Sequence, residues 1–303
     1  MLKYGVLLGA SLLAACVDDP TTGEVTAAVQ GGARTSEFTG VGYIVNTVND
    51  EACTATRIGE RTLLTAAHCL MRYPERTTLS TVSASSIRFY PAADASRLAG
   101  AEYTAERVIP HAEFGGGAVN DIAVIILRSA PGDDVERVPI ASRASAAGDE
   151  VSIVGYGDPR FGYRQVATNT IAVVRTSTYE IQGDGNICDG DSGGPSIVTR
   201  DAQQYVAGVH TGRIGDCGER AFDERVDFYA DWIIEQAAGD VLVEEPAAPP
   251  PPEDGGDTPA DDPGVLDSED TAAGCAAGGQ GATGGLALAL GALLAVRRRA
   301  TRR

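Results

Sequence analysis

The stretch Gly-Asp-Ser-Gly-Gly-Pro at residues 190–195 is the most informative part of this 303-residue sequence. Ser192 stands among glycines, which permit backbone bends that a side chain would obstruct. A serine hydroxyl attacks a carbonyl only if a base takes its proton and donors stabilise the oxygen that becomes negative. The backbone N–H groups of Gly190 and Ser192 are the candidate donors. A plain glycine-rich turn is the alternative, because Asp, Ser, Gly and Pro are common in turns.

Two upstream segments supply a candidate base and a candidate acid. Thr-Ala-Ala-His-Cys at residues 65–69 contains His68, and Asn-Asp-Ile-Ala-Val-Ile-Ile-Leu at residues 120–127 places Asp121 before an apolar strand. In a triad, the histidine takes the serine proton and later gives it to the leaving group, while the aspartate fixes the imidazole tautomer. A core histidine and a strand-entry cap are the structural alternatives for these two residues.

The order His68, Asp121, Ser192 and the three local sequences resemble the chymotrypsin/trypsin family over roughly residues 29–238. The resemblance implies an all-β fold of two six-stranded antiparallel barrels, a catalytic cleft between them and a C-terminal helix. It implies a serine endopeptidase that forms an acyl-enzyme on Ser192 and acts on proteins or peptides. No cofactor and no metal is expected. His111 matches a structural loop of the family, so we do not expect it to be catalytic.

Two other classes of function compete with a peptidase. A non-enzymatic binding or adhesion module on the same fold is one, because fold does not fix function. Such modules usually lose a triad residue, whereas this chain keeps all three candidates. An esterase of the α/β-hydrolase kind is the other, but its triad follows the order Ser, Asp, His.

Short β-branched or alternating runs separated by Gly, Pro, Asp or Asn predict many antiparallel strands. The expected strands cover residues 41–47, 55–58, 62–65, 86–90, 101–109, 121–127, 150–154, 168–176, 195–199 and 205–211. Residues 66–69 should form one helical turn. Residues 227–238 are expected to form an amphipathic helix that packs Tyr229, Trp232 and Ile233 against the rest of the domain.

Four of the six cysteines match two disulfides of the resembled family, Cys53–Cys69 and Cys188–Cys217. Disulfides and an export signal together imply an oxidising compartment. The two remaining cysteines, Cys16 and Cys275, lie in the terminal segments.

The N-terminal segment predicts export. Residues 1–15 carry one lysine and then an apolar run, which is typical of a signal peptide. Leu-Ala-Ala-Cys at residues 13–16 also resembles a bacterial lipoprotein box, in which Cys16 would be lipidated. An ordinary cleavage site with a chance cysteine is the alternative.

Residues 16–28 are expected to form a propeptide. Val29 then resembles the mature N-terminus of the family, whose freed ammonium pairs with the aspartate before the nucleophile, here Asp191. We hypothesise cleavage after Ala28 by an enzyme that accepts small residues. Gln30 departs from the family pattern, which has an apolar residue there.

The C-terminal part of the sequence, from residue 239, differs in composition from the rest. Residues 239–274 contain eleven acidic residues, no basic residue and a proline run, which predicts an extended disordered linker. Residues 275–303 contain an apolar stretch followed by arginines, as in a membrane anchor. This end also resembles the sorting tags of myxobacterial surface proteins. We therefore expect an exported bacterial protein, either secreted or tethered to the cell surface or outer membrane.

The net charge of the chain bears on which molecules it can bind. The formal net charge is −18, which does not favour nucleic acid as a partner. Nothing in the sequence indicates an oligomeric state.

The resemblance also indicates the residues around the primary specificity pocket. Asn186 occupies its floor, where trypsin-like enzymes have an aspartate, so a strict preference for basic residues is not expected. His210 resembles a histidine of glutamate-specific relatives, and Arg213 adds a second cation, which together favour acidic substrates. Wall packing by His210 and a solvent-exposed Arg213 are the alternative. We expect three acidic residues to lie in nearby loops, where they would instead favour a basic substrate: Asp216, Asp223 and Glu224.

Overall fold

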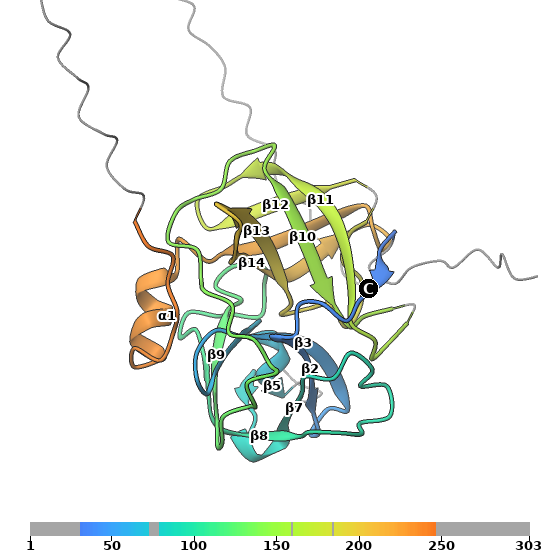
Figure 1. Cartoon of the computed structure of the whole chain (residues 1–303), viewed down its shortest axis with the longest axis vertical. Helices are drawn as coiled ribbons and strands as arrows, with labels where there is room; N and C mark the ends of the chain where they lie inside the picture. The colour runs from blue at the N-terminus through green and yellow to red at the C-terminus, as the bar shows by residue number, and fades with distance from the viewer. Residues whose placement is uncertain (1–30, 73–78, 159, 184, 247–303) are drawn as a thin grey trace, which may run out of the picture. The chain divides into compact units, whose positions relative to one another are not determined.

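The computed structural model describes residues 31–72, 79–158, 160–183 and 185–246, all within one compact unit, Met1–Pro249. Two β-barrels follow one another along the chain (Figure 1). The predicted signal peptide and propeptide, Val29, the end of the predicted linker and the C-terminal segment lie outside these residues. No helix in the described ranges is long and apolar enough to cross a membrane.

The first barrel is closed by six antiparallel strands in the order β2-β3-β4-β9-β8-β7. Their bounds are β2 Val41–Asn46, β3 Glu51–Arg57, β4 Thr62–Thr65, β7 Ile87–Tyr90, β8 Tyr103–Pro110 and β9 Ala123–Leu127. All five residues of β9 are buried, which explains its continuous apolar sequence. The short pair β5 (Met71–Arg72) and β6 (Ser80–Thr81) lies outside the barrel.

The second barrel contains the strands β11-β10-β13-β14-β15-β12, and pairing of β11 with β12 closes it. Their bounds are β10 Glu150–Gly155, β11 Gln165–Val174, β12 Thr178–Gln182, β13 Pro195–Arg200, β14 Gln203–Ile214 and β15 Arg220–Arg225. A two-residue strand, β1 (Ala33–Arg34), pairs with β11. Alternation of buried and exposed residues along β11 is typical of a sheet with one face on a core.

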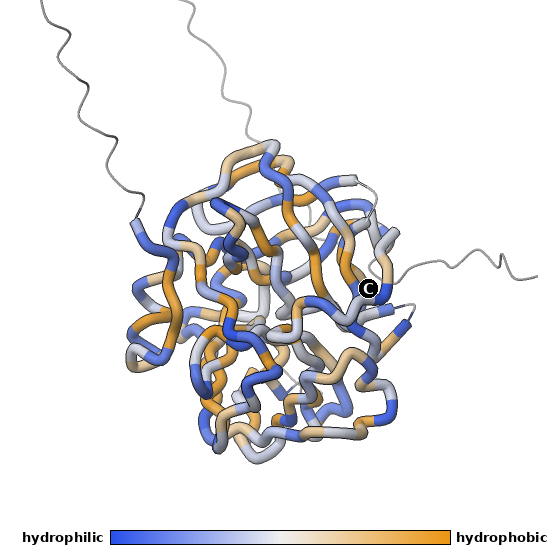
Figure 2. The backbone as a smooth tube through the Cα atoms, in the orientation of Figure 1, coloured by the Kyte–Doolittle hydropathy of each residue, from blue (hydrophilic) through white to orange (hydrophobic). Residues whose placement is uncertain are grey.

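Each barrel has its own apolar core, and a third apolar cluster joins the barrels. Tyr43 of β2 packs against Tyr156, which follows β10, with ring centroids 5.7 Å apart. Figure 2 shows hydrophobic residues interspersed along the strands of both barrels. The predicted all-β fold of two six-stranded barrels is confirmed.

The sequence analysis missed β12 and β15 because both carry charged residues. Glu180 of β12 is 1% exposed, yet Arg175 and Arg220 form ion pairs with it. These ion pairs allow a charged residue to be buried in a strand. Each barrel strand that was predicted is present, with shifted ends in most cases.

The helical elements are shorter than predicted. The helix α1 spans Ala230–Gln236, and the residue before it, Tyr229, has non-helical backbone angles (φ −97°, ψ 8°). Tyr229 and Ile233 are buried and Trp232 is partly buried, as the amphipathic pattern predicted. The predicted turn at residues 66–69 is instead the 3₁₀-helix η1, His68–Leu70.

Candidate active site

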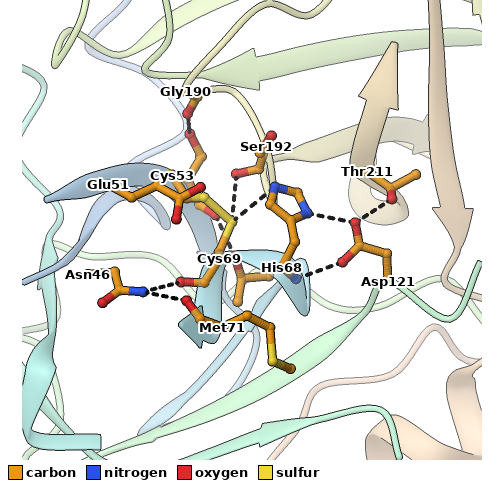
Figure 3. Close-up of a disulfide and its surroundings, with 12 residues drawn as sticks. Asn46, Glu51, Cys53, His68, Cys69, Met71, Asp121, Gly190, Ser192 and Thr211 are labelled. Carbon is orange, nitrogen blue, oxygen red and sulfur yellow. Dashed lines mark hydrogen bonds and ion pairs between the residues drawn. A yellow bond between two sulfur atoms is a disulfide. The ribbon is translucent and has the colours of Figure 1, made fainter. Parts of the chain in front are cut away.

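The three triad candidates come together where the barrels meet (Figure 3). His68 begins η1, Asp121 precedes β9, and Ser192 lies in the turn before β13. His68 Nδ1 lies 2.6 Å from Asp121 Oδ2, and the His68 backbone N–H donates to Asp121 Oδ1 at 2.8 Å. Ser192 lies beside the imidazole on the side away from Asp121 (Figure 3). These positions match a serine nucleophile, a base and an orienting acid.

Asp121 is held tightly. Its side chain is 2% exposed, and the Thr211 hydroxyl of β14 donates to Oδ2. A carboxylate that accepts several hydrogen bonds in a buried site keeps one orientation. The second barrel therefore fixes the acid of the first barrel.

The hydrogen bond and the negative charge of Asp121 make His68 a better proton acceptor. Burial acts to lower the pKa of His68, but the hydrogen bond and the charge of Asp121 outweigh it and raise the pKa above its usual value. A histidine with a raised pKa accepts a proton more readily. The raised pKa of His68 is therefore compatible with a general base at this position.

The turn that carries Ser192 is anchored to the first barrel through Thr54 of β3. The Thr54 backbone N–H donates to the Ser192 carbonyl at 2.8 Å, and the Thr54 hydroxyl donates to the Gly190 carbonyl at 3.0 Å. Gly190 has φ of +96°, and a Cβ there would lie 2.8 Å from the Phe161 ring. Only glycine satisfies both conditions.

Asp191 lies beneath the nucleophile and is fully buried. Its carboxylate accepts hydrogen bonds from the backbone N–H groups of Gly157 at 2.7 Å and Cys188 at 2.8 Å. Burial raises the pKa of Asp191 to about 7, against the opposing effect of these two donors. Among the described residues Asp191 has no Arg or Lys partner in an ion pair.

The three specificity candidates do not share one environment. Asn186 is fully buried, and its amide donates to the Ile181 carbonyl at 2.9 Å. His210 of β14 is also fully buried, and its Nδ1 lies 2.8 Å from Asp223 Oδ1. Arg213 is exposed and forms an ion pair with Asp189 at 3.2 Å.

Two of the nearby acidic residues are not in loops, contrary to the sequence-based expectation. Asp223 and Glu224 lie in β15, are fully buried and accept hydrogen bonds within the protein. Asp216 does lie outside the strands. It lines a pocket with Glu219, Gly185 and Cys217, close to Asn186 in the chain.

Both predicted disulfides are present. Cys53–Cys69 joins β3 to η1, and Cys188–Cys217 joins the Ser192 turn to the segment between β14 and β15. Each disulfide therefore ties a segment of the triad to the neighbouring strands.

In the described part of the chain, Cys53, His68 and Cys69 bring possible metal-binding atoms within 4.8 Å of one another. The two sulfurs form a disulfide, and a metal site requires thiolates. This group therefore does not fit a metal ion.

The ring of His111 contacts two aromatic side chains near the C-terminal helix. It packs between the rings of Tyr229 and Trp232, with centroids 5.5 and 5.0 Å away, and burial lowers its pKa. This packing agrees with a structural role.

Sequence reasoning did not identify Thr54, Thr211 or Glu224 as partners of the site. Thr211 follows His210 in a predicted strand, but no local pattern indicates that it reaches Asp121. Thr54 and Glu224 act across the barrel boundary, so only the tertiary structure identifies them.

The fold and the site define a two-barrel protein with a serine, histidine and aspartate at the barrel boundary. Residues 30–233 match the trypsin family. The chain belongs to this family, which supports a serine peptidase.

Proposed function

We propose that the protein is a serine endopeptidase in which Ser192 forms an acyl-enzyme, His68 is general base and acid, and Asp121 orients His68. The geometry that carries this proposal is the pair of hydrogen bonds from His68 to Asp121, at 2.6 and 2.8 Å. The backbone N–H groups of Gly190 and Ser192 form the oxyanion hole, which stabilises the negative oxygen of the attacked carbonyl.

Cleavage of a fluorescent casein by the segment that begins at Val29 tests the proposal, with Ser192→Ala as the matched control. We expect activity in the parent, and a loss of several orders of magnitude in the variant. Labelling of Ser192 by a fluorophosphonate separates the two explanations of an inactive parent. A labelled parent would indicate a narrow substrate range, and an unlabelled one would favour a binding module.

We propose further that cleavage after Ala28 activates the enzyme. The support is Asp191, whose buried carboxylate accepts two N–H groups and is available for a cation. A freed Val29 ammonium would neutralise it and hold the Ser192 turn. Mass spectrometry of the active form that shows an intact bond between residues 28 and 29 would contradict this.

For the primary pocket, we propose a preference for acidic residues, with Arg213 as the cationic group and His210 as a second substrate-binding residue. Arg213 reaches Asp189, three residues before Ser192, so its guanidinium lies close to the reaction site. The buried position of His210 requires the side chain or the pocket wall to move before a substrate reaches it. Asp216 and Glu219 favour the opposite preference. A peptide-library profile without enrichment of Glu or Asp at the cleaved position would remove the acidic proposal.

The proposed domain arrangement is a signal peptide at residues 1–15, a propeptide at 16–28, the peptidase at 29–238, an acidic linker at 239–274 and a C-terminal anchor or sorting segment at 275–303. The first residues of the predicted linker are not extended: Asp240 accepts the Glu60 backbone N–H and the buried Glu244 accepts that of Arg143, so residues 239–244 pack with the peptidase domain. Lipid on Cys16 and processing at Cys275 are alternative means of attachment to the cell surface. Mass spectrometry of protein from the membrane and culture-medium fractions tests both.

A further inference from the structure

Glu224 forms a hydrogen bond with the backbone of the proposed catalytic acid. The Asp121 backbone N–H donates to Glu224 Oε1 at 2.9 Å. Glu224 belongs to β15 of the second barrel, while Asp121 leads into β9 of the first. The bond therefore connects the two barrels at the residue that orients His68.

The backbone at Asp121 needs such a contact. Asn120 has φ of +58°, in the left-handed region that few non-glycine residues adopt. The Tyr229 hydroxyl donates to the Asn120 side chain at 2.9 Å. Tyr229 and Glu224 thus hold two successive residues of the turn, and Thr211 holds the Asp121 carboxylate.

Stability alone gives no good reason for a glutamate at this position. Glu224 is fully buried, and its Oε2 has no hydrogen-bond partner among the residues described. Burial raises the pKa of Glu224 to about 7, against the opposing effect of hydrogen bonds from the Asp121 backbone, the Tyr229 hydroxyl and the Asn120 backbone. A buried carboxyl group with one oxygen unpartnered costs free energy, so a functional contact with the turn at Asn120 and Asp121 is the better explanation.

We propose that Glu224 is a positioning residue, which holds the Asp121 backbone so that the Asp121 carboxylate meets both His68 N–H groups. Glu224 acts through Asp121 and does not touch the substrate. The expected change in kcat rests on the proposed peptidase function. The expected change in the pKa of His68 does not.

The test compares Glu224→Gln with Glu224→Leu in the active form of the protein. Glutamine keeps an acceptor oxygen, so kcat should stay within about 3-fold of the parent. Leucine has a similar size but no acceptor, so the Asp121 backbone should shift. We expect kcat to fall about 10- to 100-fold with an almost unchanged KM, because small displacements of catalytic groups are costly.

Glu244→Gln is the matched control. Glu244 is another buried glutamate, and it accepts the backbone N–H groups of Ser142 and Arg143, both at 3.1 Å, away from the triad. This variant should lose thermal stability and keep its kcat. A fall in kcat equal to that of Glu224→Leu would mean that loss of stability alone explains the result, and would overturn the proposal.

NMR titration of His68 supplies a readout that does not need activity, since the chain has only three histidines. In Glu224→Leu the pKa of His68 should fall toward its usual value, because Asp121 no longer meets the ring closely. Wild-type kcat and an unchanged His68 pKa in Glu224→Leu would overturn the proposal. A lowered His68 pKa in a chain that never hydrolyses peptides would support the positioning role and contradict the peptidase function.

If Glu224→Leu does not fold, Glu224→Asp replaces it. Aspartate is one methylene shorter and draws the acceptor away from the Asp121 N–H. The same loss of kcat and the same fall in the His68 pKa are expected. Parent values for both quantities in this variant would again overturn the proposal.

Discussion

His210 and Asp223 form a fully buried side-chain pair across β14 and β15, with Nδ1 and Oδ1 2.8 Å apart. His210 directly follows the part of β14 that pairs with β13. The next residue, Thr211, donates a hydrogen bond to Asp121. The pair therefore fixes the strand that reaches the triad. The bond satisfies one polar atom of each side chain, while His210 Nε2 and Asp223 Oδ2 have no hydrogen-bond partner among the described residues.

Removal of one member of this pair should destabilise the protein. Asp223→Leu leaves the His210 ring buried without its acceptor, and we expect a loss of about 1–3 kcal/mol in the free energy of unfolding. The double variant His210→Leu/Asp223→Leu leaves no unpaired group and should be more stable than the single one. Urea denaturation measures both, and a double variant that is less stable than Asp223→Leu would contradict the explanation.

Asp121→Asn should impair catalysis without unfolding the protein. The amide does not stabilise the imidazolium and favours the wrong tautomer, so we expect kcat to fall about 10⁴-fold. Steady-state kinetics on a peptide substrate measures the loss, and circular dichroism checks the fold. A variant with near-wild-type kcat would exclude Asp121 as the orienting acid.

The pH profile should report His68. The general base works in its neutral form, so kcat/KM should rise as the pH increases through the pKa of His68. Because Asp121 raises that pKa, the midpoint should lie above the usual 6.5, and it should move to lower pH in Asp121→Asn. An unchanged midpoint in the variant would show that another group controls the profile.

Gly190→Ala should disable the proposed oxyanion hole. The left-handed backbone and the contacts with Phe161 and Gly157 leave no room for a methyl group. We expect kcat to fall about 10²- to 10³-fold, the effect of losing one oxyanion donor. Gly117→Ala is the control, because a Cβ at Gly117 meets no atom within 4 Å. Equal activities of the two variants would contradict the role of Gly190.

The uncleaved chain should lose stability as the pH rises from about 4 to 7. The pKa of Asp191 is raised from 3.8 to about 7, so in this range the folded state keeps a proton that the unfolded state releases. Folded protein that binds more protons becomes less stable with increasing pH. If Val29 pairs with Asp191 after cleavage, the cleaved form should lose the part of this dependence that Asp191 contributes, while the part from Glu224, whose pKa is also raised to about 7, stays in both forms. Thermal unfolding at pH 4 and 7 compares the two forms, and identical pH dependence would argue against the pairing.

Local sequence was sufficient for the triad. The glycine-rich turn around Ser192, the segment around His68 and the apolar strand after Asp121 each carry a recognisable pattern, and the structure brings His68 and Asp121 into contact. The strands were predictable wherever apolar residues alternate or run together. Strands β12 and β15 were not predictable, because they carry charged residues. The ion pairs that allow Glu180 of β12 to be buried involve arginines outside that strand.

The sequence by itself determined the all-β pattern and the identity of the triad candidates, since these depend on short motifs and their order. The two-barrel class and the disulfide partners followed from the resemblance to the chymotrypsin/trypsin family. Only the tertiary structure decided what surrounds the triad candidates. Asn186 turned inward, His210 paired with Asp223, and Glu224 reached the Asp121 backbone. Each of these contacts joins residues from different strands or turns, and whether a buried polar group is satisfied depends on neighbours that local sequence does not specify.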